Sequence, residues 1–177
     1  MIFNTKSLML AVSLLLPLTQ NGSAGQIAST DAKLEIRLTE KKPAPGLIKI
    51  YSAEYKGNIY LHKTAIVTNH DILEVRVQRH AVPEYLLEFI KAGKVKLHQD
   101  VNDLYEVDLK FTKEAGQRLA TATENHIGKP MAILVSGKLI TAAVLTAQTS
   151  DRVVIVKGDW GFTKQEAEQL ASSISIK

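Results

Sequence analysis

Three segments of the chain alternate apolar and polar residues with the period of a β-strand. They are Lys33–Thr39, Glu74–Gln78 and Tyr105–Phe111. In the first, Leu34, Ile36 and Leu38 share one face and charged residues fill most of the other. Such alternation is typical of strands with one buried face. We expect strands over all three segments, the first of them solvated on its polar face.

The pattern changes to helical spacing after Phe111. Thr112 can cap a helix, and Gly128 with Pro130 should end it. The apolar positions of this helix recur every three or four residues and are Ala115, Leu119, Ala122, Thr123 and Ile127. Two apolar strands joined at Ser136-Gly137 follow, then a strand over Val153–Val156. A second helix should begin at Thr163, which has Glu166 at the spacing of a capping box.

The remaining segments are less regular. Lys41–Gly46 holds two prolines and breaks the first strand, and Leu47–Tyr60 is ambiguous between strand and loop. Ile59–Val67 should be extended, and Asn69–Ile72 should form a turn or one helical turn. Pro83–Ala92 predicts a helix with an apolar stripe that packs against the rest of the domain, although a partner-binding helix remains an alternative. Val95–Leu97 could add a short strand.

Together these elements predict an α+β fold. Strand, helix, hairpin, strand and helix succeed one another from Tyr105 to Ile174, and both helices carry an apolar stripe. We expect a two-layer sandwich in which helices cover one face of a mostly antiparallel sheet.

The N-terminus has the pattern of a signal peptide. Lys6 precedes an apolar run, Leu8–Leu18, and small residues follow up to Ala24. The run is shorter than the roughly 20 apolar residues that a spanning helix needs, so a retained anchor is the less favoured alternative. We expect a signal peptide at 1–24 and one domain at 25–177. The protein should be periplasmic or extracellular, without a stable membrane span after cleavage.

Composition narrows the function classes. The chain has no cysteine, so an exported domain must be held together by burial without disulfides. Its formal net charge of +4 is spread among acidic residues, without a basic run interleaved with aromatics. This distribution indicates a solvated surface of mixed charge and argues against nucleic-acid binding.

No segment carries a recognisable catalytic or metal motif. The histidines lack the helical spacing of zinc hydrolases, although a tertiary cluster such as His70, Asp71 and His98 remains open. Ser136 lacks a nucleophile-elbow context. The acidic residues Asp100, Asp103 and Asp108 lack the glycine and glutamate of a calcium loop, and Gly158 and Gly161 lack a phosphate-loop signature. Trp160 fits a buried lid better than an exposed anchor. We therefore assign no catalytic, cofactor-binding or metal-ligating residue.

Three sequence motifs between residues 112 and 167 resemble those of a known protein family. They are Thr112-Lys-Glu-Ala-Gly at a helix start, the run Asn125–Val144 with its Gly-Lys-Pro-Met-Ala-Ile-Leu-Val-Ser-Gly-Lys-Leu-Ile-Thr core, and Gly161-Phe-Thr-Lys-Gln-Glu-Ala. They resemble the P1 head subdomain of the SecD/SecDF protein-export subunit. Ser136 stands where that family has Asp, and Ala143 where it has Pro. Upstream, Ile59–Ile72 is similar to the segment that precedes the head.

The resemblance implies a non-enzymatic, extracytoplasmic domain without a cofactor that binds polypeptide or an envelope or export-machinery protein. An exposed sheet edge could accept an extended polypeptide by backbone pairing. We expect the edge at Lys33–Thr39, with Leu139–Leu145 as second choice; an edge blunted by Lys41, Lys42 and Pro43 is the alternative. A small hydrolase or metal-dependent enzyme, with a site formed only in the tertiary structure, is the competing function.

Overall fold

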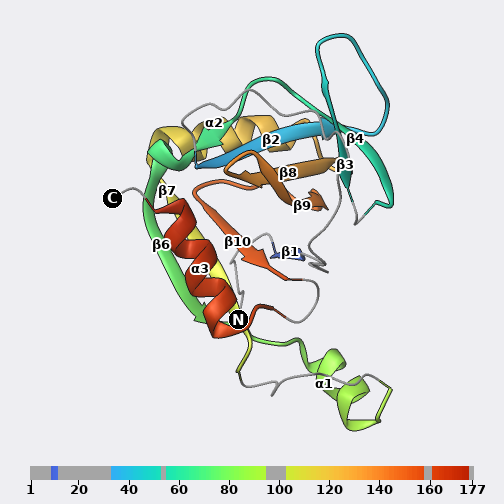
Figure 1. Cartoon of the computed structure of the whole chain (residues 1–177), viewed down its shortest axis with the longest axis vertical. Helices are drawn as coiled ribbons and strands as arrows, with labels where there is room; N and C mark the ends of the chain where they lie inside the picture. Colours follow the sequence, from blue (N-terminus) through green and yellow to red (C-terminus); the bar gives the residue numbers. More distant parts are fainter. Residues whose placement is uncertain (1–8, 12–32, 53–54, 95–102, 158–160, 176–177) are drawn as a thin grey trace.

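The computed structural model describes residues 9–11, 33–52, 55–94, 103–157 and 161–175. Figure 1 traces the whole chain, and the described part combines two sheets with three α-helices. The predicted α+β class is confirmed. Residues Val95–Leu97, His98, Asp100, Gly158 and Trp160 lie outside the described part, as does most of the predicted signal peptide.

The first sheet has the strand order β1-β10-β7-β6. Its strands are β1 (Met9–Ala11), β10 (Arg152–Val156), β7 (Tyr105–Phe111) and β6 (Ile72–Arg79). The pairs β10–β7 and β7–β6 are antiparallel, whereas β1 runs parallel to β10. The strands predicted at Glu74–Gln78, Tyr105–Phe111 and Val153–Val156 are confirmed.

The second sheet has the order β3-β4-β2-β8-β9, with β5 also pairing with β2. All its pairs are antiparallel. Its strands are β2 (Leu34–Glu40), β3 (Ile48–Ser52), β4 (Gly57–Leu61), β5 (Val67–Thr68), β8 (Pro130–Val135) and β9 (Lys138–Val144). The ambiguous segment Leu47–Tyr60 thus forms most of a hairpin. The predicted turn at Ser136-Gly137 joins β8 to β9, and both residues have positive φ, of 49° and 73°.

The helices begin where their caps predict. Thr112 Oγ1 accepts a hydrogen bond from the Ala115 amide and starts α2 (Lys113–Glu124). Thr163 and Glu166 form the predicted capping box of α3 (Lys164–Ile174). The α2 helix ends earlier than expected, and Ile127 is 55% exposed instead of buried. The His126 amide bonds to Thr123 O in a tight turn, which ends the helix before Ile127 can join its apolar face.

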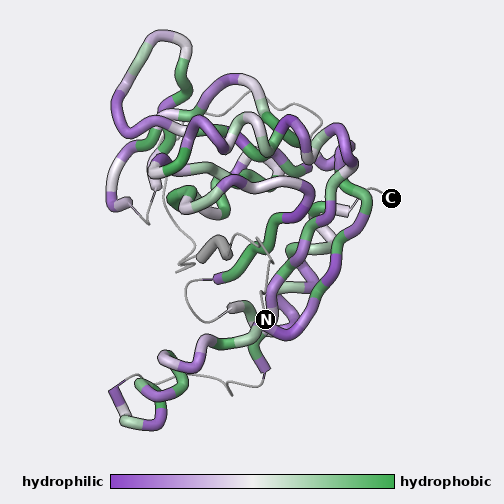
Figure 2. The backbone as a smooth tube through the Cα atoms, turned by 180° about the vertical axis from the view of Figure 1, so that it is seen from behind, coloured by the Kyte–Doolittle hydropathy of each residue, from purple (hydrophilic) through white to green (hydrophobic). Residues whose placement is uncertain are grey.

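A single main core joins both sheets to α2 and α3. Alternate strand residues face it, and Figure 2 shows hydrophobic segments gathered in the central strands. Its fully buried members include Leu34, Ile36, Val107, Leu109, Phe111, Ala115, Leu119, Met131, Ile133, Val153, Ile155, Ala167 and Ile174. The predicted inward face of β7 is therefore confirmed, as is that of α2 at Ala115, Leu119 and Thr123, whereas Ala122 is only half-buried.

The second sheet also has a smaller core on its opposite face. Ile59 and Leu61 of β4 pack there with Ala132 and Leu134 of β8 and with Ala142 of β9. The β3–β4 hairpin supplies this layer, since β4 pairs with the end of β2 and β3 also contacts β9.

The prediction that β2 is solvated on its polar face is wrong. Glu35, Arg37 and Thr39 are 4%, 3% and 0% exposed. Arg37 Nε donates to Glu35 Oε2 at 2.6 Å, and Arg37 Nη1 donates to the carbonyl oxygens of His62 and Lys63. These bonds satisfy the buried charges, so a polar alternation that normally marks a solvated face lies inside the protein.

The helix predicted near Pro83 is α1 (Glu84–Lys91), but its expected packing on the domain is wrong. None of its residues is buried, and its apolar stripe, Leu86, Leu87 and Ile90, is half-buried and belongs to neither core of the described residues. Tyr85 and Phe89 are 60% and 43% exposed. Figure 1 shows α1 projecting from the body below the first sheet. The short helical turn predicted at Asn69–Ile72 is present as η1 (Asn69–Asp71).

Candidate functional site

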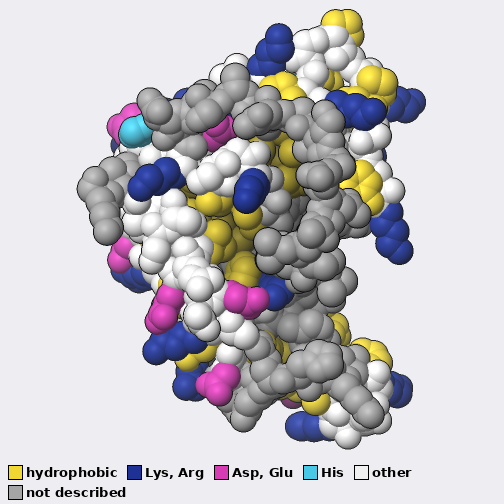
Figure 3. Space-filling model, viewed as in Figure 1, with side chains coloured by type: hydrophobic (Ala, Val, Ile, Leu, Met, Phe, Trp, Pro, Cys, Tyr) yellow, Lys and Arg dark blue, Asp and Glu magenta, His cyan; other side chains and the backbone are white. Residues whose placement is uncertain are grey.

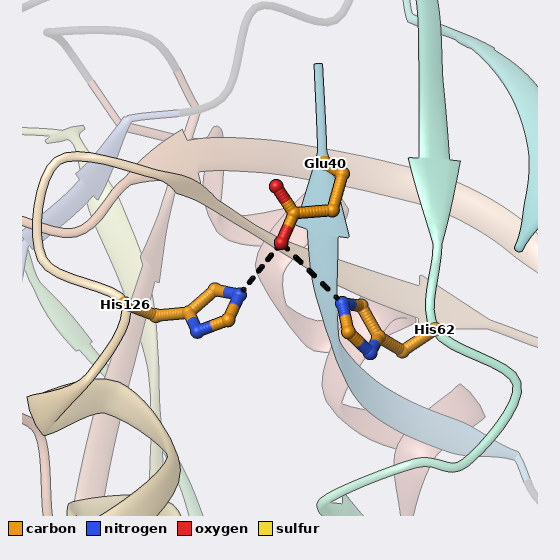
Figure 4. Close-up of side chains that lie close together, drawn as sticks. All are labelled: Glu40, His62 and His126. Carbon is orange, nitrogen blue, oxygen red and sulfur yellow. Dashed lines mark ion pairs between the residues drawn. The ribbon is translucent and has the colours of Figure 1, made fainter. Parts of the chain in front are cut away.

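Three potential ligands for a metal ion meet at one end of the second sheet (Figure 4). Glu40 is the last residue of β2, His62 follows β4, and His126 lies between α2 and β8. Glu40 Oε1 is 3.3 Å from His126 Nε2 and 3.7 Å from His62 Nε2. Figure 4 shows both imidazole rings turned toward the same carboxylate. We call these three residues the Glu40 cluster.

Backbone pairing places the first two members. Glu40 is the register partner of Tyr60, and the His62 amide donates to Leu38 O at 2.9 Å. The two side chains therefore leave adjacent strands at the same sheet end.

A turn places the third member. Gly128 has a φ of +83°, and its amide donates to Leu145 O at 2.8 Å, which fixes the turn between α2 and β8 against the end of β9. Thr39 Oγ1 donates to Pro130 O at 2.8 Å and ties the start of β8 to β2. His126 is thereby held opposite Glu40 by segments distant in sequence.

Lys129 dominates the electrostatics of the cluster. Its Nζ lies 3.0 Å from Glu40 Oε1, and this hydrogen bond lowers the pKa of Glu40 against the opposing effect of burial. Burial lowers the pKa of His126, and the positive charge of Lys129 adds to that shift. Around neutral pH the arrangement therefore favours an ionised Glu40 and a neutral His126.

An open pocket of about 770 Å³ lies beside the cluster. It is lined by residues 40–47, 62–63 and 128–130, so Glu40 and His62 form part of its wall together with Lys41, Lys42, Lys63 and Lys129. Solvent and small solutes can therefore reach the carboxylate. On the face drawn in Figure 3, Lys and Arg side chains are interspersed with Asp and Glu, as the mixed charge of the sequence predicts.

Of the cluster that the sequence left open, His98 lies outside the described residues. Asp71 accepts a hydrogen bond from Arg118 at 2.7 Å and one from the Thr68 amide, while His70 is exposed. Asp108 pairs with Arg152. Sequence reasoning missed the Glu40 cluster because its members have no motif spacing. Strand pairing and the turn between α2 and β8 bring them together.

The structure also changes which strand edges are candidates for polypeptide binding. The preferred edge at Lys33–Thr39 is wrong, because β2 lies inside its sheet between β8 on one side and β4 and β5 on the other. Among the described strands, β9, the second choice, is a terminal strand of its sheet, as are β3 and, in the first sheet, β1 and β6. Within the described residues, no helix is both long and apolar enough to cross a membrane.

Comparisons with known proteins identify the relatives of this chain. The family model of the SecDF P1 head subdomain matches residues 87–175, half of the chain. Protein translocase subunit SecD of Aquifex aeolicus (strain VF5) is 28% identical over 153 residues, which cover 83% of this chain and 26% of that protein. The chain thus spans about a quarter of this relative's length.

Two solved structures share the fold. A crystal structure of SecDF in its super-membrane-facing form superposes with a TM-score of 0.52 at 18% identity, covering 84% of this chain and 19% of that one. A structure of the membrane component SecDF that enhances protein export gives 0.51 at 16% identity, covering 93% and 76%. The family match over half of the chain shows that the chain belongs to the SecDF P1 head family.

Proposed function

We propose that this protein is a non-enzymatic, extracytoplasmic domain that binds extended polypeptide during protein export. Its relative is a translocase subunit, and one structural neighbour is a membrane component that enhances protein export. The observation that carries the proposal is the outer edge of β6. This eight-residue strand pairs with β7 on one side and with no described strand on the other.

The hydrogen-bond alternation of β7 identifies the β6 groups that a client would meet. Tyr105 exchanges backbone hydrogen bonds with Phe162, so it does not bond its register partner Arg79. The amide and carbonyl groups of alternate residues in an antiparallel strand point in opposite directions. Those of Val75, Val77 and Arg79 therefore point away from β7 toward an incoming strand.

Side chains leave this edge accessible over a limited length. Val75 and Val77 pack on the main core, whereas Glu74 and Arg76 form an exposed ion pair with a separation of 2.5 Å. The register shifts between Ile72 and Glu74, which ends regular pairing there. An extended client can thus add to residues 75–79 through its backbone, with little dependence on its side chains.

A titration with a reduced, unfolded polypeptide tests the proposal. We expect the amide resonances of Val75, Val77 and Arg79 to shift more than those of Arg76 and Gln78. A peptide N-methylated at alternate residues along one edge should not produce these shifts, because it lacks the donors for pairing. Equal shifts with both peptides, or none at millimolar ligand, would refute edge pairing at β6.

A matched pair of variants tests the same edge from the protein side. Arg79→Pro removes an outward-pointing donor without removing a bond to β7, whereas Arg79→Ala removes the same charge and keeps the donor. We expect weaker client binding for Arg79→Pro than for Arg79→Ala. Equal binding by the two variants would show that charge, not backbone pairing, recruits the client.

Export itself rests on the N-terminal pattern. Cleavage of a signal peptide after Ala24 would leave a mature N-terminus near Gly25 and would remove β1 from the edge of the first sheet, beside β10. Mass spectrometry of the protein recovered from outside the cytoplasm should find that terminus. Recovery of a chain that still begins at Met1 would contradict the assignment.

A metal-dependent enzyme is the second candidate, and the Glu40 cluster is the observation that favours it. Two imidazoles and one carboxylate can hold a catalytic zinc ion. Hydrolysis also needs a positioned general base, and the group that contacts the cluster's carboxylate is the Lys129 ammonium, which carries no free electron pair while protonated. The cluster thus supports metal binding more directly than catalysis.

A further inference from the structure

We propose that Glu40, His62 and His126 form a binding site for a divalent transition-metal ion, with Zn²⁺ as the best fit. Two imidazole nitrogens and one carboxylate oxygen are ligands that zinc prefers. This proposal is independent of polypeptide binding at β6, which lies in the other sheet.

The separations of the ligand atoms fit tetrahedral coordination. Ligands about 2.0–2.1 Å from a tetrahedral zinc ion lie about 3.3 Å from one another. The Glu40–His126 and Glu40–His62 separations are 3.3 Å and 3.7 Å, and no pair of ligand atoms in the cluster is more than 4.8 Å apart. A modest approach of the two imidazoles would complete the geometry, with a fourth position left for water or an anion.

The two histidine nitrogens lack conventional partners. The Nε2 atoms of His62 and His126 are buried and make no hydrogen bond of acceptable geometry among the described residues, although both lie near Glu40 Oε1. A buried polar atom without a good partner costs free energy. A metal ion between the rings would coordinate both lone pairs and neutralise part of the carboxylate charge.

Lys129 occupies the place of a competing cation. Its ammonium lies 3.0 Å from Glu40 Oε1, and its side chain is 47% exposed. Because this side chain can turn into solvent, an incoming metal ion can displace it at the cost of one exposed ion pair. Lys63 lines the same pocket, but among the described residues the lysine that bonds to Glu40 is Lys129. Replacing Lys63 therefore controls for the loss of one positive charge from the pocket.

Isothermal titration calorimetry of the tag-free, metal-stripped chain with Zn²⁺ alone tests the site, and we expect one zinc ion to bind per chain. In NMR spectra, the same addition of Zn²⁺ should shift the ring resonances of His62 and His126. Glu40→Gln and His126→Ala should each weaken binding by at least about tenfold, since loss of even an outer-shell contact costs a metal site this much. His70→Ala removes an exposed histidine outside the cluster and should bind as the unchanged chain does.

The lysine pair keeps the test decisive if a ligand variant fails to fold. Lys129→Met should tighten zinc binding by about twofold to fivefold, the scale of an exposed ion pair, and Lys63→Met should change it less. Circular dichroism checks that each variant is folded. Absence of saturable zinc binding, equal affinities for Glu40→Gln and His70→Ala, or equal effects of the two lysine variants would overturn the proposal.

Discussion

Replacement of Leu119 by Ala probes the main core at the point where α2 enters it. Leu119 is fully buried, and Ala115 and Thr123, which lie one turn away on either side, are fully buried as well. The change removes three carbon groups, worth about 2.4 kcal/mol at ~0.8 kcal/mol each. The cavity left behind adds to this transfer cost, because small neighbours on the same helix face cannot fill it. We therefore expect a loss of about 2–5 kcal/mol in the free energy of unfolding.

Urea denaturation followed by circular dichroism measures this loss. Lys138→Ala is the control, because Lys138 is exposed beside the β8–β9 turn and its replacement should change stability by less than about 0.5 kcal/mol. Thermal unfolding should agree, with a fall of ~2–4 °C in Tm per kcal/mol for a domain of this size. Equal midpoints for the two variants would refute the assignment of the buried face of α2.

Three further predictions follow from buried or strained groups. Arg37→Ala should cost about 3–5 kcal/mol, because it removes the charge partner of buried Glu35; an unchanged urea midpoint would contradict this. Gly161→Ala should lower Tm, because Gly161 has a φ of +95° and a Cβ there would lie 2.8 Å from a backbone oxygen of β7. Burial raises the pKa of Glu166, but its hydrogen bonds, of which the one from Lys157 has the largest effect, lower the pKa further, to a value below its ordinary 4.5. Its contribution to stability is thus present above that value and lost as the pH falls through the folded-state pKa, so acid unfolding of Glu166→Gln should show a smaller pH dependence.

Local signals in the sequence predicted the second half of the fold well. The cap at Thr112, the capping box at Thr163 and the turn at Ser136-Gly137 each depend on residues within a few positions of one another. Predictions from such local signals are correct because the caps and the turn that they specify need no contact with residues distant in the sequence. The alternation in Tyr105–Phe111 was equally informative, because one face of that strand lies in the main core together with residues of both helices.

The burial of β2 and the Glu40 cluster could not be predicted in the same way. The polar face of β2 is buried because a hairpin from the ambiguous segment Leu47–Tyr60 adds a second layer, and the partners of Arg37 are carbonyl groups of residues 62 and 63. Glu40, His62 and His126 share no periodicity. Their proximity depends on the register of β2 with β4 and on the turn after α2, and neither has a local signature.

The position of β8 between two cores constrains insertions and deletions. Met131, Ile133 and Val135 face the main core, whereas Ala132 and Leu134 face the smaller one. A gain or loss of one residue in this strand would exchange the two sets of side chains. In a sheet with one solvent-exposed face, one of the two exchanged sets of side chains would contact water. Here each set would instead have to pack into the core that fits the other set. Length changes in this family member should therefore be tolerated at the Ser136-Gly137 turn and not within Pro130–Val135.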